Sequence, residues 1–231
     1  MRNDIPLKCS WANLRLGRGR QSDNPSGIAM PDFIGICLVL LVLGGCVNLG
    51  RSYPEKHFYI LETVHPGEMH ASIPGTILKV RKFRASPAFE RKELVYRTSD
   101  ARYEGDFYNE WFVPPNAMIT QQVVNWLTRA GLFQYVMDSS GPLPATHSLE
   151  GTLTALYGDY RATPAKAVLA VQFFLLHEAS GQAEVLWHQE YRKEVDVMER
   201  TPEALVSGWN EALRLILSAL DEDLTRTLQR R

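Results

Sequence analysis

Apolar and polar positions alternate along residues 57–231 in a way that predicts eight strands and two helices. In the expected strands, apolar side chains recur at every second residue or fill a short run rich in β-branched and aromatic residues. These strands are expected at 57–63, 76–83, 93–99, 102–112, 132–138, 148–160, 166–178 and 183–197. Segment 166–178 is apolar on both faces, which indicates a central strand covered on both sides. Segment 183–197 becomes charged toward its end, so we expect it nearer an edge.

The two helices are predicted at 113–131 and 201–229. Pro114 and Pro115 suit the start of the first helix, Asn116 can cap it, and Gly131 suits a left-handed stop. Thr201 can cap the second helix, whose apolar residues return every three or four positions. This second stripe comprises Leu205, Trp209, Leu213, Ile216, Leu220 and Leu224.

The order of these elements is four strands, a helix, four strands and a helix. Such an order predicts an α+β fold with a mixed, mainly antiparallel sheet and two helices packed on it. Residues 46–231 are long enough to form one domain with a full core, and we expect that domain at 57–231.

A different pattern precedes this domain. Phe33 to Leu43 is an unbroken run of 11 apolar and glycine residues. As a helix it would reach roughly 16 Å, about half the thickness of a ~30 Å hydrocarbon core, so a stable membrane span is not expected. Basic residues lie upstream and small residues follow, which is typical of a secretory signal. The alternative is a buried apolar segment. A start at Met30 would leave no basic side chain before the run.

The run ends in Leu43-Gly44-Gly45-Cys46, which resembles the end of a bacterial lipoprotein signal. In such signals the peptidase cleaves before the cysteine, here between Gly45 and Cys46, and the thiol carries a diacylglycerol. We therefore expect residues 1–45 to be removed and Cys46 to be acylated, with palmitate among its fatty acids. Cys37 is a poor alternative because the bulky Ile36 precedes it. Polar residues 46–56 would form the tether.

Cysteine content and charge agree with an envelope protein. The chain has three cysteines, Cys9, Cys37 and Cys46, so cleavage would leave no other thiol, which suits an oxidising compartment. Residues 1–45 hold five of the 25 Lys and Arg and three of the 26 Asp and Glu. The remaining 20 basic and 23 acidic residues give a net charge of −3. Such a balance gives no support to nucleic-acid binding.

Catalytic motifs are missing from the sequence. It contains no phosphate-binding loop, no G-x-S-x-G nucleophile elbow and no H-E-x-x-H pair. The histidines are scattered and no pair has a spacing that demands a metal: His57, His65, His70, His147, His177 and His188. We expect no enzyme activity, no catalytic or metal site and no cofactor.

Several short motifs occur in an order that resembles one family. They begin with Tyr59-Ile60-Leu61, then Val80 with Phe83, Val95-Tyr96-Arg97, Tyr103 with Trp111-x-x-Pro114-Pro115, and Gly131-Leu132-Phe133 with Val136. This order resembles the ABC-type transport auxiliary lipoproteins (PqiC/YmbA-like) over essentially the whole mature chain. Phe112 departs from the pattern, which has a small residue after the Trp.

The resemblance implies a non-catalytic lipoprotein anchored in the outer membrane on its periplasmic side. Its partner would be an MCE-type periplasmic protein of a lipid transport system, joined to an inner-membrane permease and ATPase. Val47 agrees, because an Asp at that position retains similar lipoproteins in the inner membrane of some bacteria. Tyr96, Arg97 and Trp111 are candidate partner-binding residues, and the alternative is that they are core. A lipid or peptide carrier is the rival function, and a homo-oligomer is possible.

Overall fold

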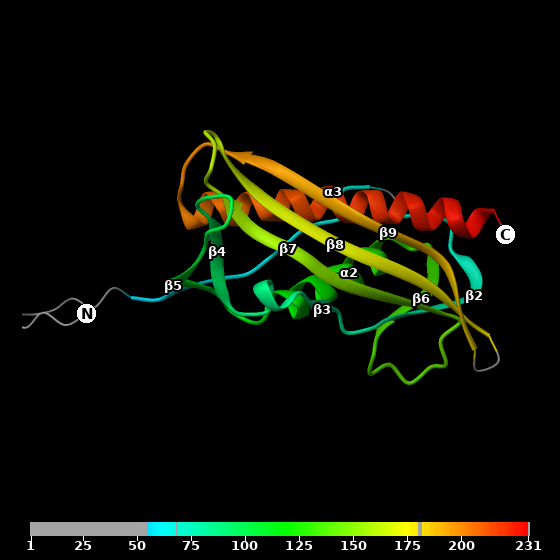
Figure 1. The fold of residues 1–231 in the computed structure, drawn as a ribbon. Coiled ribbons are helices and arrows are strands. Elements are labelled where there is room, and N and C mark those ends of the chain that lie inside the picture. Colours follow the sequence, from blue (N-terminus) through cyan, green and yellow to red (C-terminus); the bar gives the residue numbers. More distant parts are fainter. Residues whose placement is uncertain (1–54, 68, 180–181, 231) are drawn as a thin grey trace, which may run out of the picture. The chain divides into compact units, whose positions relative to one another are not determined.

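Three long antiparallel strands, β7 (His147–Asp159), β8 (Ala165–Ala179) and β9 (Gln182–Val197), form the main part of the sheet in a computed structural model of the chain (Figure 1). The structure describes residues 55–67, 69–179 and 182–230, and labels follow Figure 1. β8 lies between β7 and β9, and among the described residues β9 pairs only with β8. The predicted central and edge positions of these two strands are thus confirmed.

The other edge of β7 pairs, in parallel, with three segments that follow one another along the chain. They are β2 (Ile73–Val80), β3 (Arg84–Ala85) and β4 (Glu93–Arg97). β2 and β4 each pair with a further strand on the side away from β7. β2 pairs with β6 (Phe133–Asp138), and β4 pairs with β5 (Tyr103–Trp111), which in turn pairs with β1 (His57–Tyr59).

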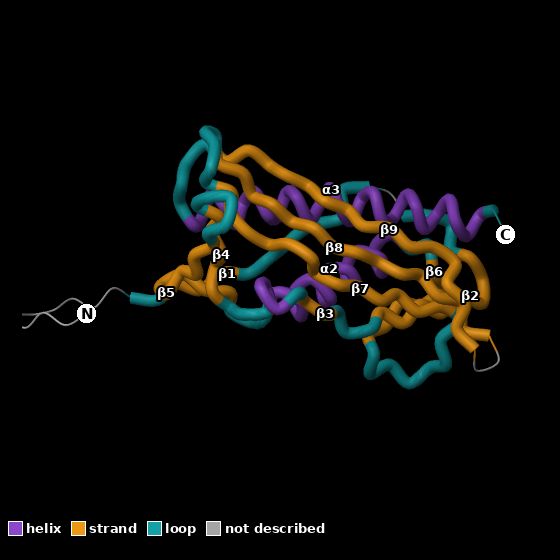
Figure 2. Tube along the Cα trace, in the orientation of Figure 1, coloured by secondary structure: helices purple, strands orange, loops and turns teal. Residues whose placement is uncertain are grey.

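Two helices pack on this sheet (Figure 2). α3 (Pro202–Gln229) runs along β8 and β9, while α2 (Pro115–Ala130) packs against β6, β2 and β7 and touches α3. The main core lies between the helices and the sheet. The predicted α+β class, with one domain, a mixed sheet and two helices, is confirmed.

α3 approaches the sheet closely because it carries a glycine at the contact. A Cβ on Gly208 would lie 2.6 Å from the Cβ of Ala167 on β8. Next to it, the Trp209 indole N–H donates to the carbonyls of Tyr157 and Val168, at 3.3 and 3.2 Å. A buried indole is thus satisfied by strand backbone, and the helix is fixed in place on the sheet.

The helix ends follow the prediction with one exception. The Thr201 hydroxyl accepts a hydrogen bond from the Ala204 N–H, and Gly131 adopts a φ of 74° at the end of α2. Asn116 does not cap α2 and that prediction is wrong: Pro114 is the cap residue, and the Asn116 amide instead donates to the Phe83 carbonyl.

The first predicted strand, 57–63, is too long, since β1 ends at Tyr59. The chain beyond it lies against the helices: the backbone N–H groups of Glu62 and Thr63 donate to Asn210 on α3 and Gln122 on α2. Leu61 is buried in the core. A short apolar run therefore became a loop whose backbone groups are satisfied by helix side chains.

The second predicted strand, 76–83, is displaced toward the N-terminus, because β2 begins at Ile73 and ends at Val80. Beyond it the chain turns the Phe83 ring into the core, over Gly151 of β7. A Cβ on Gly151 would lie 2.7 Å from that ring. The close approach depends on a glycine in a strand, and the alternation at 76–83 carries no sign of it.

Candidate partner-binding surface

The β4–β5 hairpin holds all three residues predicted to bind a partner, and two of them, Tyr96 and Arg97, lie at its surface. Tyr96, in β4, is half-buried and stacks on Tyr160 with ring centroids 5.2 Å apart. Its hydroxyl donates to Asp106 at 2.7 Å. Burial raises the pKa of Tyr96, and the hydrogen bond to Asp106 raises it further. Tyr96 therefore stays neutral and acts as a fixed donor.

Asp106 organises the bend in β5. Besides Tyr96, its carboxylate accepts from the Asn109 amide at 2.8 Å and from the backbone N–H groups of Tyr108 and Asn109 at 2.9 and 3.1 Å. Burial alone would raise the pKa of Asp106, but these hydrogen bonds outweigh it and lower the pKa. The carboxylate thus fixes the strand segment from which the following side chains project.

Arg97, the next residue on β4, is half-buried and held in one direction. Its guanidinium donates to the carbonyls of Ser99 and Asp100, at 3.3 and 2.9 Å. It also lies 5.4 Å from the ring centroid of Tyr103, its partner in the β4–β5 register. The side chain keeps its charge at the surface while its direction is set by the turn.

Trp111 does not belong to this surface, and its prediction as a partner-binding residue is wrong. Its side chain is 1% exposed and packs against Trp209, with ring centroids 5.3 Å apart. The cause is the register shift in the β4–β5 pairing, which turns Trp111 toward α3. The neighbouring Phe112 is 62% exposed, so the residue that departs from the family pattern lies on the surface.

A shallow apolar groove of about 430 Å³ adjoins Arg97 on the β4–β5 hairpin. It is lined by Ala88, Arg91, Glu93, Val95, Tyr103, Glu104, Gly105 and Phe107. Tyr103 also contacts Tyr157 of β7 edge-on, at 5.4 Å. Phe107 was not among the predicted surface residues, although its alternation with Tyr103 and Gly105 along the strand was a signal for it.

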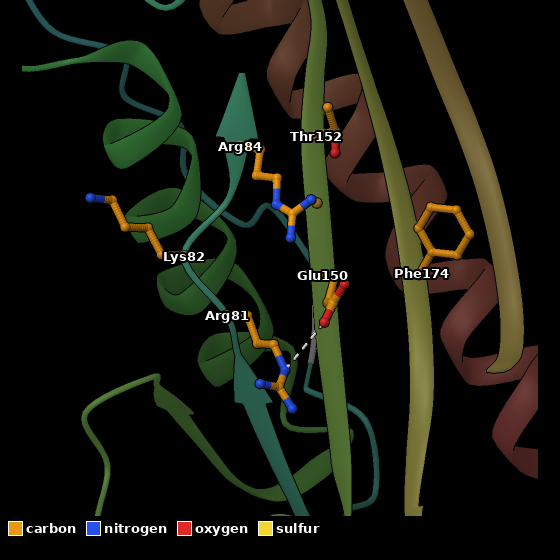
Figure 3. Close-up of a pocket in the computed structure, with 7 residues that line it drawn as sticks. Arg81, Lys82, Arg84, Glu150, Thr152 and Phe174 are labelled. Carbon is orange, nitrogen blue, oxygen red and sulfur yellow. Dashed lines mark ion pairs between the residues drawn. The ribbon is translucent and has the colours of Figure 1, made fainter. Parts of the chain in front are cut away.

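A second groove, of about 310 Å³, lies where β2 gives way to β3 beside β7 (Figure 3). Arg81 points toward Glu150 at 3.4 Å and also pairs with Glu178 at 2.9 Å, so its charge is neutralised. Lys82 points away from β7. Within the described part of the chain, Arg84 makes no ion pair. The groove is a solvated ionic surface.

Two histidines connect the loop before β2 to Asp221 of α3. His70 Nε2 lies 2.9 Å from Asp221 Oδ2, and His65 Nε2 lies 3.5 Å from the same oxygen. The Gly67 N–H donates to His65 Nδ1, so the proton of the neutral ring is on Nε2 and faces the carboxylate. Among the described residues, no group of three His, Cys, Asp or Glu side chains is suited to a metal.

The predicted lipid attachment point, Cys46, and the cleavage position at Gly45 lie outside the described residues. Within residues 55–67, 69–179 and 182–230, no helix is both long and apolar enough to cross a membrane.

Comparison with known proteins decides the family. The model of the ABC-type transport auxiliary lipoprotein component matches residues 59–221, which is most of the chain. The chain belongs to this family. The match extends from β1 to the last third of α3, so it includes the β4–β5 hairpin and its groove.

Solved structures show the same fold. A crystal structure of a Xanthomonas campestris protein aligns with a TM-score of 0.61 at 16% identity, covering 76% of this chain and 96% of that one. Another, described as an uncharacterized protein, aligns with a TM-score of 0.54 at 19% identity, covering 75% and 99%. A search of curated protein sequences finds no match.

Proposed function

We propose that this protein is an outer-membrane-anchored, non-catalytic component of an ABC and MCE-type lipid transport system. On this proposal it binds the periplasmic MCE protein. The observation that carries the proposal is the family match over residues 59–221, which covers nearly all of the folded domain. Acylation of Cys46 supplies the anchor, and the signal of residues 1–45 delivers the protein to the envelope.

Arg97 and the adjoining groove are the proposed docking surface. Interfaces favour a fixed arginine beside aromatic side chains, because both lose little conformational entropy when a partner binds. Arg97 is held by two backbone carbonyls and lies over Tyr103, whose ring borders the groove. Tyr96 stabilises this surface, because its hydroxyl donates to Asp106 and its ring stacks on Tyr160.

Anchoring gives such a surface a physical advantage. A domain fixed to one membrane meets a partner that reaches across from the other membrane at a raised effective concentration. A modest intrinsic affinity then suffices, and a shallow groove with one fixed cation can provide it.

The test is a pull-down of residues 47–231 with the MCE-type protein encoded beside it. We expect the folded domain to bind, and Arg97→Ala to weaken binding at least about fivefold, the change that corresponds to a loss of ~1 kcal/mol. Arg102→Ala is the matched control, since that arginine lies on the adjacent turn with its side chain 72% exposed. Failure of the well-folded domain to bind an intact partner would reject the proposal.

A further inference from the structure

Four aromatic side chains are exposed together where β1 pairs with β5. Phe58, Phe107 and Phe112 are 54%, 66% and 62% exposed, and Tyr108 is 41% exposed. We call these four residues the aromatic edge. Large aromatic side chains gathered in this way on a surface mark a contact with a protein or a lipid.

The aromatic edge consists of two ring pairs with Lys56 beside them. The rings of Phe58 and Phe112 meet edge-on at 6.3 Å, and those of Phe107 and Tyr108 meet at 5.2 Å. Lys56 joins the two pairs, because its ammonium lies 4.4 Å from the Phe107 ring centroid and also pairs with Glu110. Glu110 is the register partner of Phe58.

The strand register explains why these rings point outward. Tyr59 pairs with Trp111, and the buried Trp111 ring faces α3. Phe58 and Phe112 are direct chain neighbours of these two residues, so they project from the opposite face of the β1–β5 pair. Phe107 and Tyr108 lie in the segment of β5 where the β4–β5 register shifts, and both are exposed there.

The chain that leads to this edge is short. Only ten residues, 47–56, separate Cys46 from the first residue of β1. Even fully extended, this segment reaches roughly 35–40 Å, and a flexible coil of this length averages about 18 Å. An acyl group on Cys46 therefore keeps β1, and the aromatic edge beside it, close to the lipid.

We propose that the aromatic edge lies on the phospholipid surface into which the acyl chains of Cys46 insert. Phenyl and phenol rings partition into the headgroup boundary, and flanking cations add an attraction to anionic lipids. Lys92 supplies such a cation, since its ammonium donates to the Phe112 carbonyl at 2.9 Å, whereas Lys56, over Phe107, is paired with Glu110. This inference rests on the proposed lipid anchor.

This contact would orient the whole domain. Phe58 and Phe112 lie at the Trp111 end of β5, whereas Arg97 lies beside Tyr103 at the other end. Eight residue steps at about 3.3 Å put these ends roughly 25 Å apart, or less where the strand bends at Asp106. Phe58 and Phe112 at the membrane and Arg97 at the proposed partner would thus lie toward opposite ends of the same strand, with Phe107, which also lines the groove, between them.

The experiment uses the full lipoprotein, processed and reconstituted into vesicles of phosphatidylethanolamine and phosphatidylglycerol. Because acylation would occupy Cys46 and cleavage would remove Cys9 and Cys37, an introduced cysteine can be labelled alone. Phe58→Cys and Phe112→Cys receive an environment-sensitive fluorophore, and brominated acyl chains serve as the quencher. Met198→Cys is the control, because this residue is 87% exposed between β9 and α3. Circular dichroism confirms that each variant is folded.

We expect labels at 58 and 112 to shift their emission to the blue and to be quenched at least about twofold more than the label at 198. Equal emission and quenching at 58, 112 and 198, in folded protein that sediments with the vesicles, would overturn the proposal. The sedimentation and the mass of the acylated N-terminus report on the anchor separately. A missing anchor would therefore be recognised as a failure of the proposed function.

Discussion

At the scale of single residues, Asp106 determines the geometry of the β4–β5 surface. One carboxylate accepts from Tyr96, from the Asn109 amide and from two backbone N–H groups. Charge-assisted hydrogen bonds of this kind are stronger than neutral ones, and they fix the segment of β5 from which Phe107, shared by the groove and the aromatic edge, projects.

We expect Asp106→Ala to lower the free energy of unfolding at neutral pH by about 1–3 kcal/mol. The pKa of Asp106 is lowered in the folded protein, so its contribution is present above the unfolded value of about 3.9. That contribution is lost as the pH falls through the folded pKa, and wild type and variant should converge there. Urea unfolding at a series of pH values measures this difference.

Asp100→Ala is the control for the Asp106 experiment. The Asp100 carboxylate is 92% exposed and pairs with Arg161 at the surface, so its removal should change stability little at any pH. A difference between wild type and Asp106→Ala that persists unchanged at acid pH would contradict the assignment of the effect to the carboxylate.

Cys46 is the residue on which the anchor depends. We expect Cys46→Ala to remain an uncleaved precursor that takes up no labelled palmitate. Several acyl chains, each gaining roughly 0.8 kcal/mol per buried CH₂, make an anchor nearly permanent, whereas one chain is marginal. Cys37→Ala is the matched control and should be processed and labelled normally. Palmitate incorporation by Cys46→Ala at the wild-type level would contradict the proposed attachment point.

At the scale of elements, α3 contributes the largest single stripe to the core. Leu205, Trp209, Leu213, Ile216, Leu220 and Leu224 are all buried, as their spacing predicted. The stripe lies along β8 and β9, so this helix covers one face of the long strands (Figure 1).

Two leucines of α3 make a matched test of this packing. Leu213 is fully buried, and Leu215, two positions on, is only half-buried. We expect Leu213→Ala to cost about 2–5 kcal/mol and Leu215→Ala clearly less, because only the first leaves a cavity in the core. Urea unfolding midpoints measure both, and a larger loss at Leu215 would contradict the assigned face of the helix.

The elements with a long, regular pattern could be predicted from the sequence. Both helices and the strands β4 to β9 occur close to their expected positions, because periodicity and helix-end residues are local signals. The ends of β1 and β2 could not be predicted, because they depend on residues distant in the sequence. Gln122 and Asn210 accept hydrogen bonds from the chain after β1, and the Phe83 ring packs over Gly151.

The candidate site was less predictable than the fold. Tyr96 and Arg97 lie at the hairpin surface, but the register shift in β5 buries Trp111 and exposes Phe112. An alternating pattern divides the side chains of a strand between two faces but does not tell which face is buried. A bulge reverses the buried and exposed positions beyond it in the same strand. Only the pairing of β4 with β5 reveals that exchange.

At the scale of the whole molecule, the family is one of transport auxiliary lipoproteins, and we propose that this member acts by binding a partner. The chain belongs to the ABC-type transport auxiliary lipoproteins, and its candidate surface consists of a fixed arginine, aromatic rings and a shallow groove. In the proposed arrangement, one end of β5 lies at the membrane and the other faces the periplasmic partner.

The most direct test of this account compares two ligands for the mature domain. Residues 47–231 are titrated with the purified MCE-type protein and, separately, with a fluorescent phospholipid. We expect saturable binding of the MCE protein, weakened by Arg97→Ala, and no stoichiometric uptake of phospholipid. Saturable uptake of one phospholipid per domain, without binding of the MCE protein, would contradict the account and favour a lipid carrier.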